Sequence, residues 1–192
     1  LIKYSSLSDD LLKSDSSINP YIFIDTLFKK LSEGSITVCA DGTACVVGFQ
    51  AATVKKDQRL FHNSGCASMG YDLPAAIGAY YSSGKVINCI AGDGSIMMNL
   101  QELAYITGKE LPIRIFLLNN DGYHSIRQTQ ANYFDNHLIG CGEESGLPFP
   151  NFKSLSKGFG IAYELSSSEQ SLETDLSKTL KFERPILHEI II

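Results

Sequence analysis

The sequence lacks any hydrophobic run approaching the roughly 18 to 20 apolar residues that a membrane helix needs. No stretch at its start has the pattern of a secretory signal peptide. Its 16 Lys and Arg residues are outnumbered by 21 Asp and Glu, which argues against nucleic acid and anionic membranes as partners. We therefore expect neither nucleic acid nor a membrane as a partner, and the cysteine usage described next favours a cytoplasmic protein.

Several other sequence signals are missing. The five cysteines form no Cys-x-x-Cys pair, and their odd number favours reduced thiols over a disulfide framework or zinc site. No Gly-x-Gly-x-x-Gly follows an expected strand, and residues 65–70 lack the Lys-Ser/Thr of a P-loop. A nucleotide-binding Rossmann module is therefore disfavoured, and we find no internal repeat.

The length and composition predict one globular domain with a short lead-in. The chain has 192 residues, 44% of them hydrophobic, which is enough to bury a substantial core. Residues 1–18 are rich in Ser, Asp and Lys and are expected to be a linker or lead-in, with the domain at 19–192. Because the chain begins with Leu1, we expect it to be a segment of a longer protein.

Helical and strand patterns alternate along the domain. Asn19 as cap, Pro20 at the first helical position and Gly34 as stop delimit the first expected helix. Ile96, Leu100, Leu103 and Ala104 mark one face of another. The expected helices are 19–34, 73–82, one containing 96–104, 149–160 and 167–182, and the expected strands are 35–41, 85–93, 112–120, 161–165 and 184–192. This alternation predicts an α/β fold: three α/β/α layers with a mainly parallel central sheet.

Polar loops follow three of the expected strands, at residues 40–44, 91–95 and 119–124. In open parallel sheets, ligands bind outside the carboxyl ends of the strands. If the strands are neighbours, Asp93 and Asn120 share one crevice and offer hard oxygen donors suited to Mg²⁺ and a bound phosphate. The alternative is structural, because Asp-Gly and Asn-Asp-Gly are also ordinary turn sequences and Asp or Ser often caps a helix.

These residues resemble the thiamine diphosphate motif, a Gly-Asp-Gly followed about two dozen or more residues later by paired Asn. Residues 92–95 and Asn119-Asn120 match it, and residues 64–79, "SGCASMGYDLPAAIGA", are similar to the cofactor loop of acetolactate synthase-like enzymes. Residues 18–27 and 184–192 fit the two ends of that family's C-terminal, diphosphate-binding domain.

The resemblance implies a site for thiamine diphosphate and Mg²⁺. Asp93 and Asn120 would bind the metal through their side chains, and Gly122 through its carbonyl. Met69 would bend the cofactor, with the Ala67 carbonyl facing its aminopyrimidine; from the residues alone, a lone Met is more often core filler. The implied cofactor-binding residues are Asp41, Gly42, Thr43, Ala67, Ser68, Met69, Gly92, Asp93, Gly94, Ser95, Asn120, Gly122 and Tyr123.

The resemblance also implies the reaction and the partners. The cofactor's thiazolium carbon attacks a 2-oxo acid and accepts electrons as carbon dioxide leaves. The activating glutamate comes from a pyrimidine-binding domain of the same or a second chain, so the complete enzyme is expected to be a homodimer or homotetramer. FAD would be bound only in another part of a longer chain. The alternatives are a separately encoded subunit of a two-chain decarboxylase and a non-catalytic module that retains the fold.

The helix after the paired Asn departs from the family pattern. Acetolactate synthases carry Met and Trp where this chain has Ser125 and Thr129, and pyruvate-type decarboxylases carry Glu where it has Ile126. His124 is the candidate catalytic residue as a proton shuttle, and Arg127 is a candidate partner for a substrate carboxylate. The alternative for each is an ordinary solvated side chain.

Two further features carry alternatives of their own. The glycine-rich segment 140–150 is either a mobile lid or a plain connection. His188 lies in an apolar strand and is expected to be a hydrogen-bonded core residue.

Overall fold

The fold begins at the last residues of the expected lead-in. A computed structural model describes residues 17–192, and the prediction for residues 1–16 lies outside them. Ile18 is buried in the core, and its N–H donates to the Ile191 carbonyl at 2.9 Å. The folded unit therefore includes Ile18 as well as the predicted domain.

Six parallel strands form one sheet within residues 17–192, in the order β2-β1-β3-β4-β6-β5. The strands are β1 (Ile36–Cys39), β2 (Arg59–Phe61), β3 (Ile87–Gly92), β4 (Ile113–Asn119), β5 (Ala162–Ser166) and β6 (Ile186–Ile191). All-parallel pairing needs a crossover between successive strands, and the helices supply these connections.

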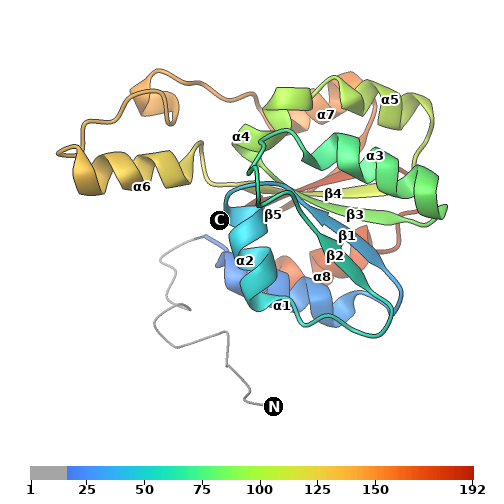
Figure 1. The fold of residues 1–192 in the computed structure, drawn as a ribbon. Helices are drawn as coiled ribbons and strands as arrows, with labels where there is room; N and C mark the ends of the chain where they lie inside the picture. Colours follow the sequence, from blue (N-terminus) through green and yellow to red (C-terminus); the bar gives the residue numbers. More distant parts are fainter. Residues whose placement is uncertain (1–16) are drawn as a thin grey trace, which may run out of the picture.

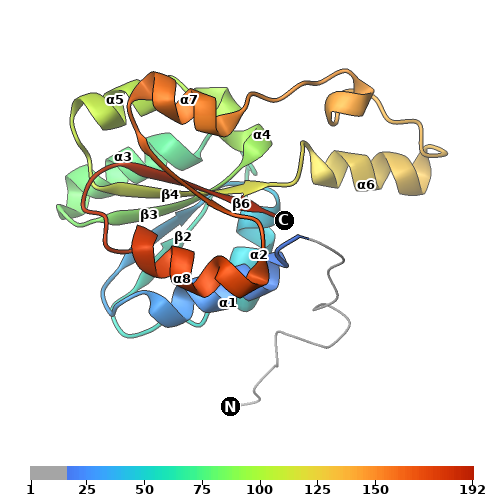
Figure 2. The same ribbon diagram turned by 180° about the vertical axis from the view of Figure 1, so that it is seen from behind.

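Helices cover both faces of the sheet (Figures 1 and 2). One layer contains α1 (Pro20–Lys30), α2 (Thr43–Ala51) and α8 (Glu169–Thr179). The other contains α3 (Asp72–Ser83), α4 (Asp93–Ile96), α5 (Glu102–Gly108) and α7 (Phe152–Phe159). The predicted three-layer α/β/α fold is confirmed. No helix of the described part combines the length and apolar character needed to cross a bilayer.

The core is densest around β4, which lies between β3 and β6. Ile115, Phe116, Leu117 and Leu118 are all buried, so both faces of this strand are covered, as its unbroken apolar run indicated. The ring of Phe116 packs against Phe23 of α1, with ring centroids 6.0 Å apart. This packing fixes the carboxyl ends of β3 and β4, which carry the polar loops.

Three elements differ from the sequence expectations. The helix expected to contain residues 96–104 is divided into α4, the 3₁₀ turn η1 (Met97–Asn99) and α5, and Ala104 is exposed. The division follows from Asn99, whose amide donates to the Gly70 carbonyl at 2.7 Å and holds the turn against the neighbouring loop. Sequence patterns also missed α2 and β2.

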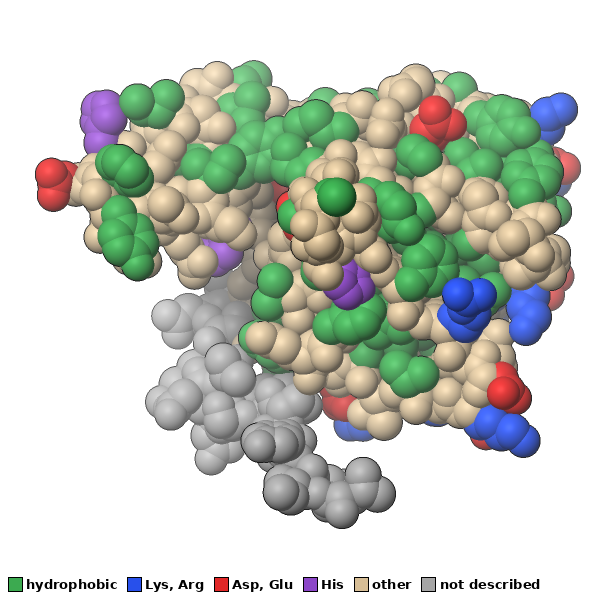
Figure 3. All heavy atoms as spheres, in the orientation of Figure 1, with side chains coloured by type: hydrophobic (Ala, Val, Ile, Leu, Met, Phe, Trp, Pro, Cys, Tyr) green, Lys and Arg blue, Asp and Glu red, His purple; other side chains and the backbone are tan. Residues whose placement is uncertain are grey.

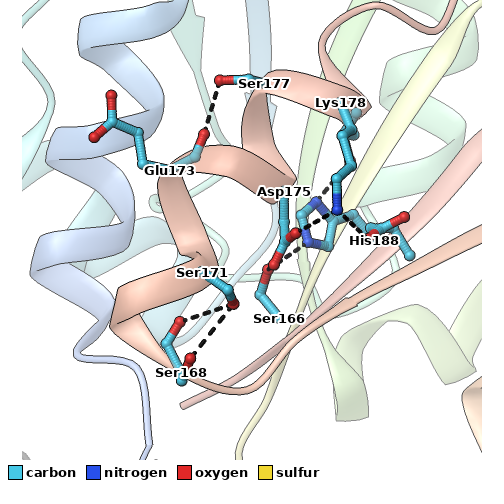
Figure 4. Close-up of polar contacts among 10 residues, drawn as sticks. Ser166, Ser168, Ser171, Glu173, Asp175, Ser177, Lys178 and His188 are labelled. Carbon is cyan, nitrogen blue, oxygen red and sulfur yellow. Dashed lines mark hydrogen bonds and ion pairs between the residues drawn. The ribbon is translucent and has the colours of Figure 1, made fainter.

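His188 is a core residue, as predicted, and is fully buried. Its ring nitrogens lie 2.9 Å from Ser166 Oγ and 2.8 Å from Thr179 Oγ1, and Ser166 also donates to Asp175 (Figure 4). Burial lowers the pKa of His188 to about 4; the charge of Asp175 opposes this shift and that of Lys178 adds to it. The ring is therefore neutral in the folded protein at neutral pH.

We expect this histidine to make stability fall in mild acid. Below pH ~6.5 His188 becomes protonated in the unfolded chain, whereas in the folded protein it stays neutral down to about pH 4. The free energy of unfolding should therefore decrease across that window, by up to about 3 kcal/mol from this residue. Urea unfolding of the wild type and His188→Gln between pH 4 and 7 tests this, and equal pH slopes would contradict it.

Candidate cofactor and metal site

A cleft of about 180 Å³ lies at the carboxyl ends of β1, β3 and β4. All of the predicted cofactor-binding residues and His124 line it except Ala67 and Ser68, which lie in the loop just before Met69; the candidate substrate contact Arg127 does not line it. The loops at residues 40–44, 91–95 and 119–124 are thereby brought together. The expected common crevice exists because β3 pairs with both β1 and β4.

Asp93 joins two of these loops. Its side chain is buried, and Oδ1 accepts the Gly94 N–H at 2.7 Å. Oδ2 accepts the N–H groups of Asn120 at 3.2 Å and Gly122 at 2.9 Å. Burial raises the pKa of the Asp93 carboxyl, and these three N–H groups offset part of that shift. The carboxylate thus shapes the loop after β4 as well as facing the cleft.

Asn120 presents an oxygen with nothing to bind it. Its Oδ1 atom is buried and has no hydrogen-bond partner within residues 17–192. An unpaired buried carbonyl oxygen is costly, so such an atom calls for a missing partner. Beside a buried carboxylate, a carboxamide oxygen is a donor that Mg²⁺ accepts. The residues present therefore fit the metal that the sequence predicts, with Asp93, Asn120 and the Gly122 carbonyl to hold it.

No cluster of three His, Cys, Asp or Glu residues suited to a metal occurs in the described part of the chain. This finding matches the predicted donor set, which contains one carboxylate. Mg²⁺ commonly takes one or two carboxylates and completes its octahedron with water and phosphate oxygens.

Gly122 is held where a side chain would not fit. Its φ is +124°, and a Cβ there would lie 2.2 Å from the Cys141 carbonyl oxygen. That carbonyl accepts the Tyr123 N–H at 2.8 Å. The segment around Cys141 therefore packs directly against the loop at residues 119–124, which we call the metal loop after its predicted ligand. A Cβ on Gly94 would likewise meet the Tyr123 ring, at 2.2 Å. Both glycines are required for this close approach.

Ser95 has a structural role that the sequence did not show. Its hydroxyl donates to Asp72 Oδ2 at 2.6 Å and accepts the Gly70 N–H at 2.9 Å. Asp72 is fully buried, and burial raises the pKa of its carboxyl. The Ser95 hydroxyl therefore connects the loop carrying Met69 to α4. Because this hydroxyl is already engaged, Ser95 would contact a bound phosphate through its backbone N–H.

The first loop provides backbone donors. Gly42 adopts φ +65° and precedes α2, whose first N–H groups have no capping side chain. Thr43 begins that helix and lines the cleft with Asp41. The N-terminus of a helix favours an anion. This arrangement suits the second contact to a diphosphate predicted for Gly42 and Thr43.

His124 and Arg127 lie at the start of α6 (His124–Tyr133), which has no buried residues and projects from the body of the molecule (Figure 1). His124 lines the cleft, and burial together with the charge of Arg127 lowers its pKa. The guanidinium of Arg127 donates to the carbonyls of Asp121 at 2.5 Å and Asn120 at 3.4 Å. Arg127 thus supports the metal loop and is engaged there, where the sequence suggested a substrate contact.

Sequence reasoning missed the residues behind the site. Asp72 and Asn99 hold the Met69 loop, and Leu118 lines the cleft from the end of β4. Asp72 stands at the first position of α3, where an acidic residue normally favours the helix dipole from the surface. The sequence therefore gave no indication that Asp72 is buried.

Comparison with known proteins gives one family. The model of the thiamine pyrophosphate enzyme C-terminal TPP-binding domain matches residues 41–190. The chain is 34% identical over 133 residues to the acetolactate synthase large subunit of Porphyra purpurea, covering 69% of this chain and 22% of that protein. It is 31% identical over 176 residues to the acetolactate synthase isozyme 2 large subunit of Escherichia coli K12, covering 89% and 32%. Against acetolactate synthase 2 of Zea mays, described as chloroplastic, identity is 28% over 183 residues, covering 93% and 29%.

The chain therefore spans about a third or less of the curated relatives it matches.

Replacing Ser95 with alanine should destabilise the domain, because it removes a donor from the buried Asp72 carboxylate. We expect a loss of about 1–3 kcal/mol in the free energy of unfolding, measured by urea denaturation. Ser125→Ala is the matched control: this serine also lines the cleft but is exposed, and its replacement should change stability by less than about 0.5 kcal/mol. Equal changes in the free energy of unfolding for the two substitutions would contradict the structural role of Ser95.

Proposed function

This chain belongs to the thiamine pyrophosphate enzymes, as a C-terminal TPP-binding domain, and from that premise we propose that it anchors Mg²⁺ and the cofactor's diphosphate in an enzyme acting on 2-oxo acids. The proposed reaction is decarboxylation with carboligation, as a lyase or transferase. The relatives named as acetolactate synthases support this proposal.

The observation that carries the proposal is the unpartnered Oδ1 atom of Asn120 beside the Asp93 carboxylate. Three backbone N–H groups donate to the Asp93 carboxylate, yet the Asn120 oxygen has no donor within residues 17–192. Asp93 and Asn120 would together hold a cation through their side-chain oxygens, and a bound Mg²⁺ would supply the charge that attracts a diphosphate.

Once bound, the cofactor supplies a carbon nucleophile and an electron sink. The chain's own residues bind and orient it. Gly42, Thr43 and Ser95 offer backbone N–H groups to the diphosphate, and Gly94, whose own N–H is donated to Asp93, leaves room for its close approach. Met69, 38% exposed, stands in the cleft as the support for a bent cofactor. His124, with its lowered pKa, is a neutral proton acceptor at pH 7.

The acceptor is proposed to differ from that of acetolactate synthases. Ser125 and Ile126 line the cleft, where the family pattern has a methionine and, in pyruvate-type decarboxylases, a glutamate. Thr129, at the tryptophan position, is directed back along its own helix, because its hydroxyl donates to the Ser125 carbonyl at 2.9 Å. Smaller and more polar residues leave room for a bulkier or hydroxylated acceptor.

The site is proposed to be completed by a pyrimidine-binding domain, within a homodimer or homotetramer. The cleft's 180 Å³ is below the ~300–1,000 Å³ usual for small-molecule sites, as expected of half a site. Apolar side chains are exposed near it on the α2 and α6 segments, and green patches cover much of this face in Figure 3. They are Val46, Phe49, Val54, Ile126, Tyr133, Phe134 and Ile139. The isolated chain would then be inactive.

The compartment is proposed to be reducing, as in the cytoplasm. The five cysteines are all free thiols, and Cys39, Cys45, Cys89 and Cys141 are buried without forming a disulfide.

Asn120→Ala should separate metal binding from folding. Because Oδ1 has no partner to lose, we expect a change in stability within about 0.5 kcal/mol. The Mg²⁺ concentration that half-saturates thiamine diphosphate binding should rise by about 100-fold or more. Tryptophan is absent, so binding is followed by calorimetry at fixed cofactor and varied Mg²⁺.

The matched control is Asn132→Ala, at an exposed position of α6. It should leave the Mg²⁺ requirement unchanged. Asp93→Ala is less informative about metal binding, because it also leaves three backbone N–H groups without their acceptor. An unchanged Mg²⁺ midpoint in Asn120→Ala would remove this residue from the metal site.

Met69→Ala should affect turnover more than anchoring. The Met69 side chain lines the cleft but has no hydrogen-bond donor to offer the diphosphate, so cofactor affinity in the complete enzyme should change by less than about threefold. The turnover number should fall by about tenfold or more, since the bent cofactor loses its support. Equal losses in affinity and turnover would assign Met69 to general packing.

A further inference from the structure

Asn119, the first residue of the Asn pair, uses both ends of its carboxamide. Its Oδ1 accepts the Asp121 N–H at 3.0 Å, closing a turn over Asn120. Its Nδ2 donates to Glu189 Oε1 at 2.6 Å. The turn has to be held, because Asp121 adopts φ +60° without being glycine.

Glu189 is a buried carboxylate in β6, behind the metal loop, and is 7% exposed. Tyr163 of β5 donates to its second oxygen at 2.5 Å. No Lys, Arg or His of residues 17–192 forms an ion pair with it. Register places Leu117 and Leu165 opposite Glu189, so Asn119, Glu189 and Tyr163 project on the same face of three adjacent strands.

An acceptor at this place decides which way Asn119 points. Glu189 accepts a hydrogen bond at each oxygen, one from Asn119 and one from Tyr163, so the amide nitrogen of Asn119 must face Glu189. The amide oxygen must then face the backbone, where the Asp121 N–H needs an acceptor. If the Asn119 amide were reversed, its oxygen would face the Glu189 carboxylate and its NH₂ group would face the Asp121 N–H.

We propose that Glu189, supported by Tyr163, is a positioning residue for the metal loop: by fixing the orientation of Asn119 it presents the Asn120 carboxamide and the Gly122 carbonyl to Mg²⁺. This inference rests on the proposed function for its metal but concerns residues that touch neither metal nor cofactor. The chain of contacts runs from Tyr163 through Glu189 and Asn119 to Asp121, at 2.5, 2.6 and 3.0 Å.

The test exchanges the polarity of one hydrogen bond. Glu189→Gln offers an amide that lets Asn119 reverse, and Asn119→Asp sets two carboxylates against each other. Each single variant should therefore loosen the turn. In the double variant Asn119→Asp/Glu189→Gln, the glutamine amide donates to an aspartate that still accepts the Asp121 N–H, so the turn should be restored. Glu164→Gln is the control, because it removes the same charge from a half-buried residue of β5.

Two measurements are made on the full chain. Hydrogen exchange at the Asn120 and Gly122 amides, without cofactor, should accelerate about tenfold in each single variant and recover in the double variant. The Mg²⁺ midpoint for thiamine diphosphate binding should rise about tenfold in the single variants and recover to within about threefold in the double.

The outcomes distinguish the inference from the proposed function. If the wild type shows no Mg²⁺-dependent binding in the complete enzyme, the proposed function fails, and amide exchange still decides whether Glu189 holds the loop. If the wild type binds but the single variants only lower thermal stability, with midpoint and exchange unchanged, Glu189 is a packing residue and the inference is overturned. A double variant no better than the two singles combined would overturn it as well.

Discussion

The carboxylate of Asp93 is the contact on which the site depends. It is buried at the end of β3 and accepts N–H groups from its own loop and from the loop after β4. A buried carboxylate needs such donors, and those donors need a chain that turns sharply. Asp121 and Gly122 supply the turn, with φ of +60° and +124°. The neighbouring Asn120 oxygen has no donor within residues 17–192, so one contact accounts for the shape of the loop and for the place of the proposed metal.

Around this contact the protein adds hydrogen bonds that support the loops lining the cleft. Ser95 and Asp72 hold the Met69 loop, while Arg127 and the Cys141 carbonyl hold the metal loop from the side of α6. Asn119 and Glu189 hold it from the sheet. A site built to bind a dianionic diphosphate must be rigid before the ligand arrives, since ordering on binding would cost affinity.

Local patterns predicted the architecture, and together with the resemblance to thiamine diphosphate enzymes they predicted the residues of the cleft. Alternating helices and strands require a parallel sheet, and polar residues after apolar strands collect at one edge of it. The supports could not be predicted in this way. Glu189 stands in an apolar strand with no sequence link to Asn119, 70 residues away. Likewise α6 buries no residue within the described part of the chain, which a surface for the proposed pyrimidine-binding domain would explain. Residues that act across strands, or across chains, carry no local signal.

The most direct test of the central claim is to locate the ion. Crystals of the chain, with its pyrimidine-binding partner if needed, would be grown with thiamine diphosphate and Mn²⁺, which shares the oxygen preference of Mg²⁺. We predict one anomalous peak bonded to an Asp93 carboxylate oxygen, Asn120 Oδ1 and the Gly122 carbonyl, with diphosphate oxygens completing the octahedron. A bound cofactor whose manganese contacts neither Asp93 nor Asn120 would contradict the account.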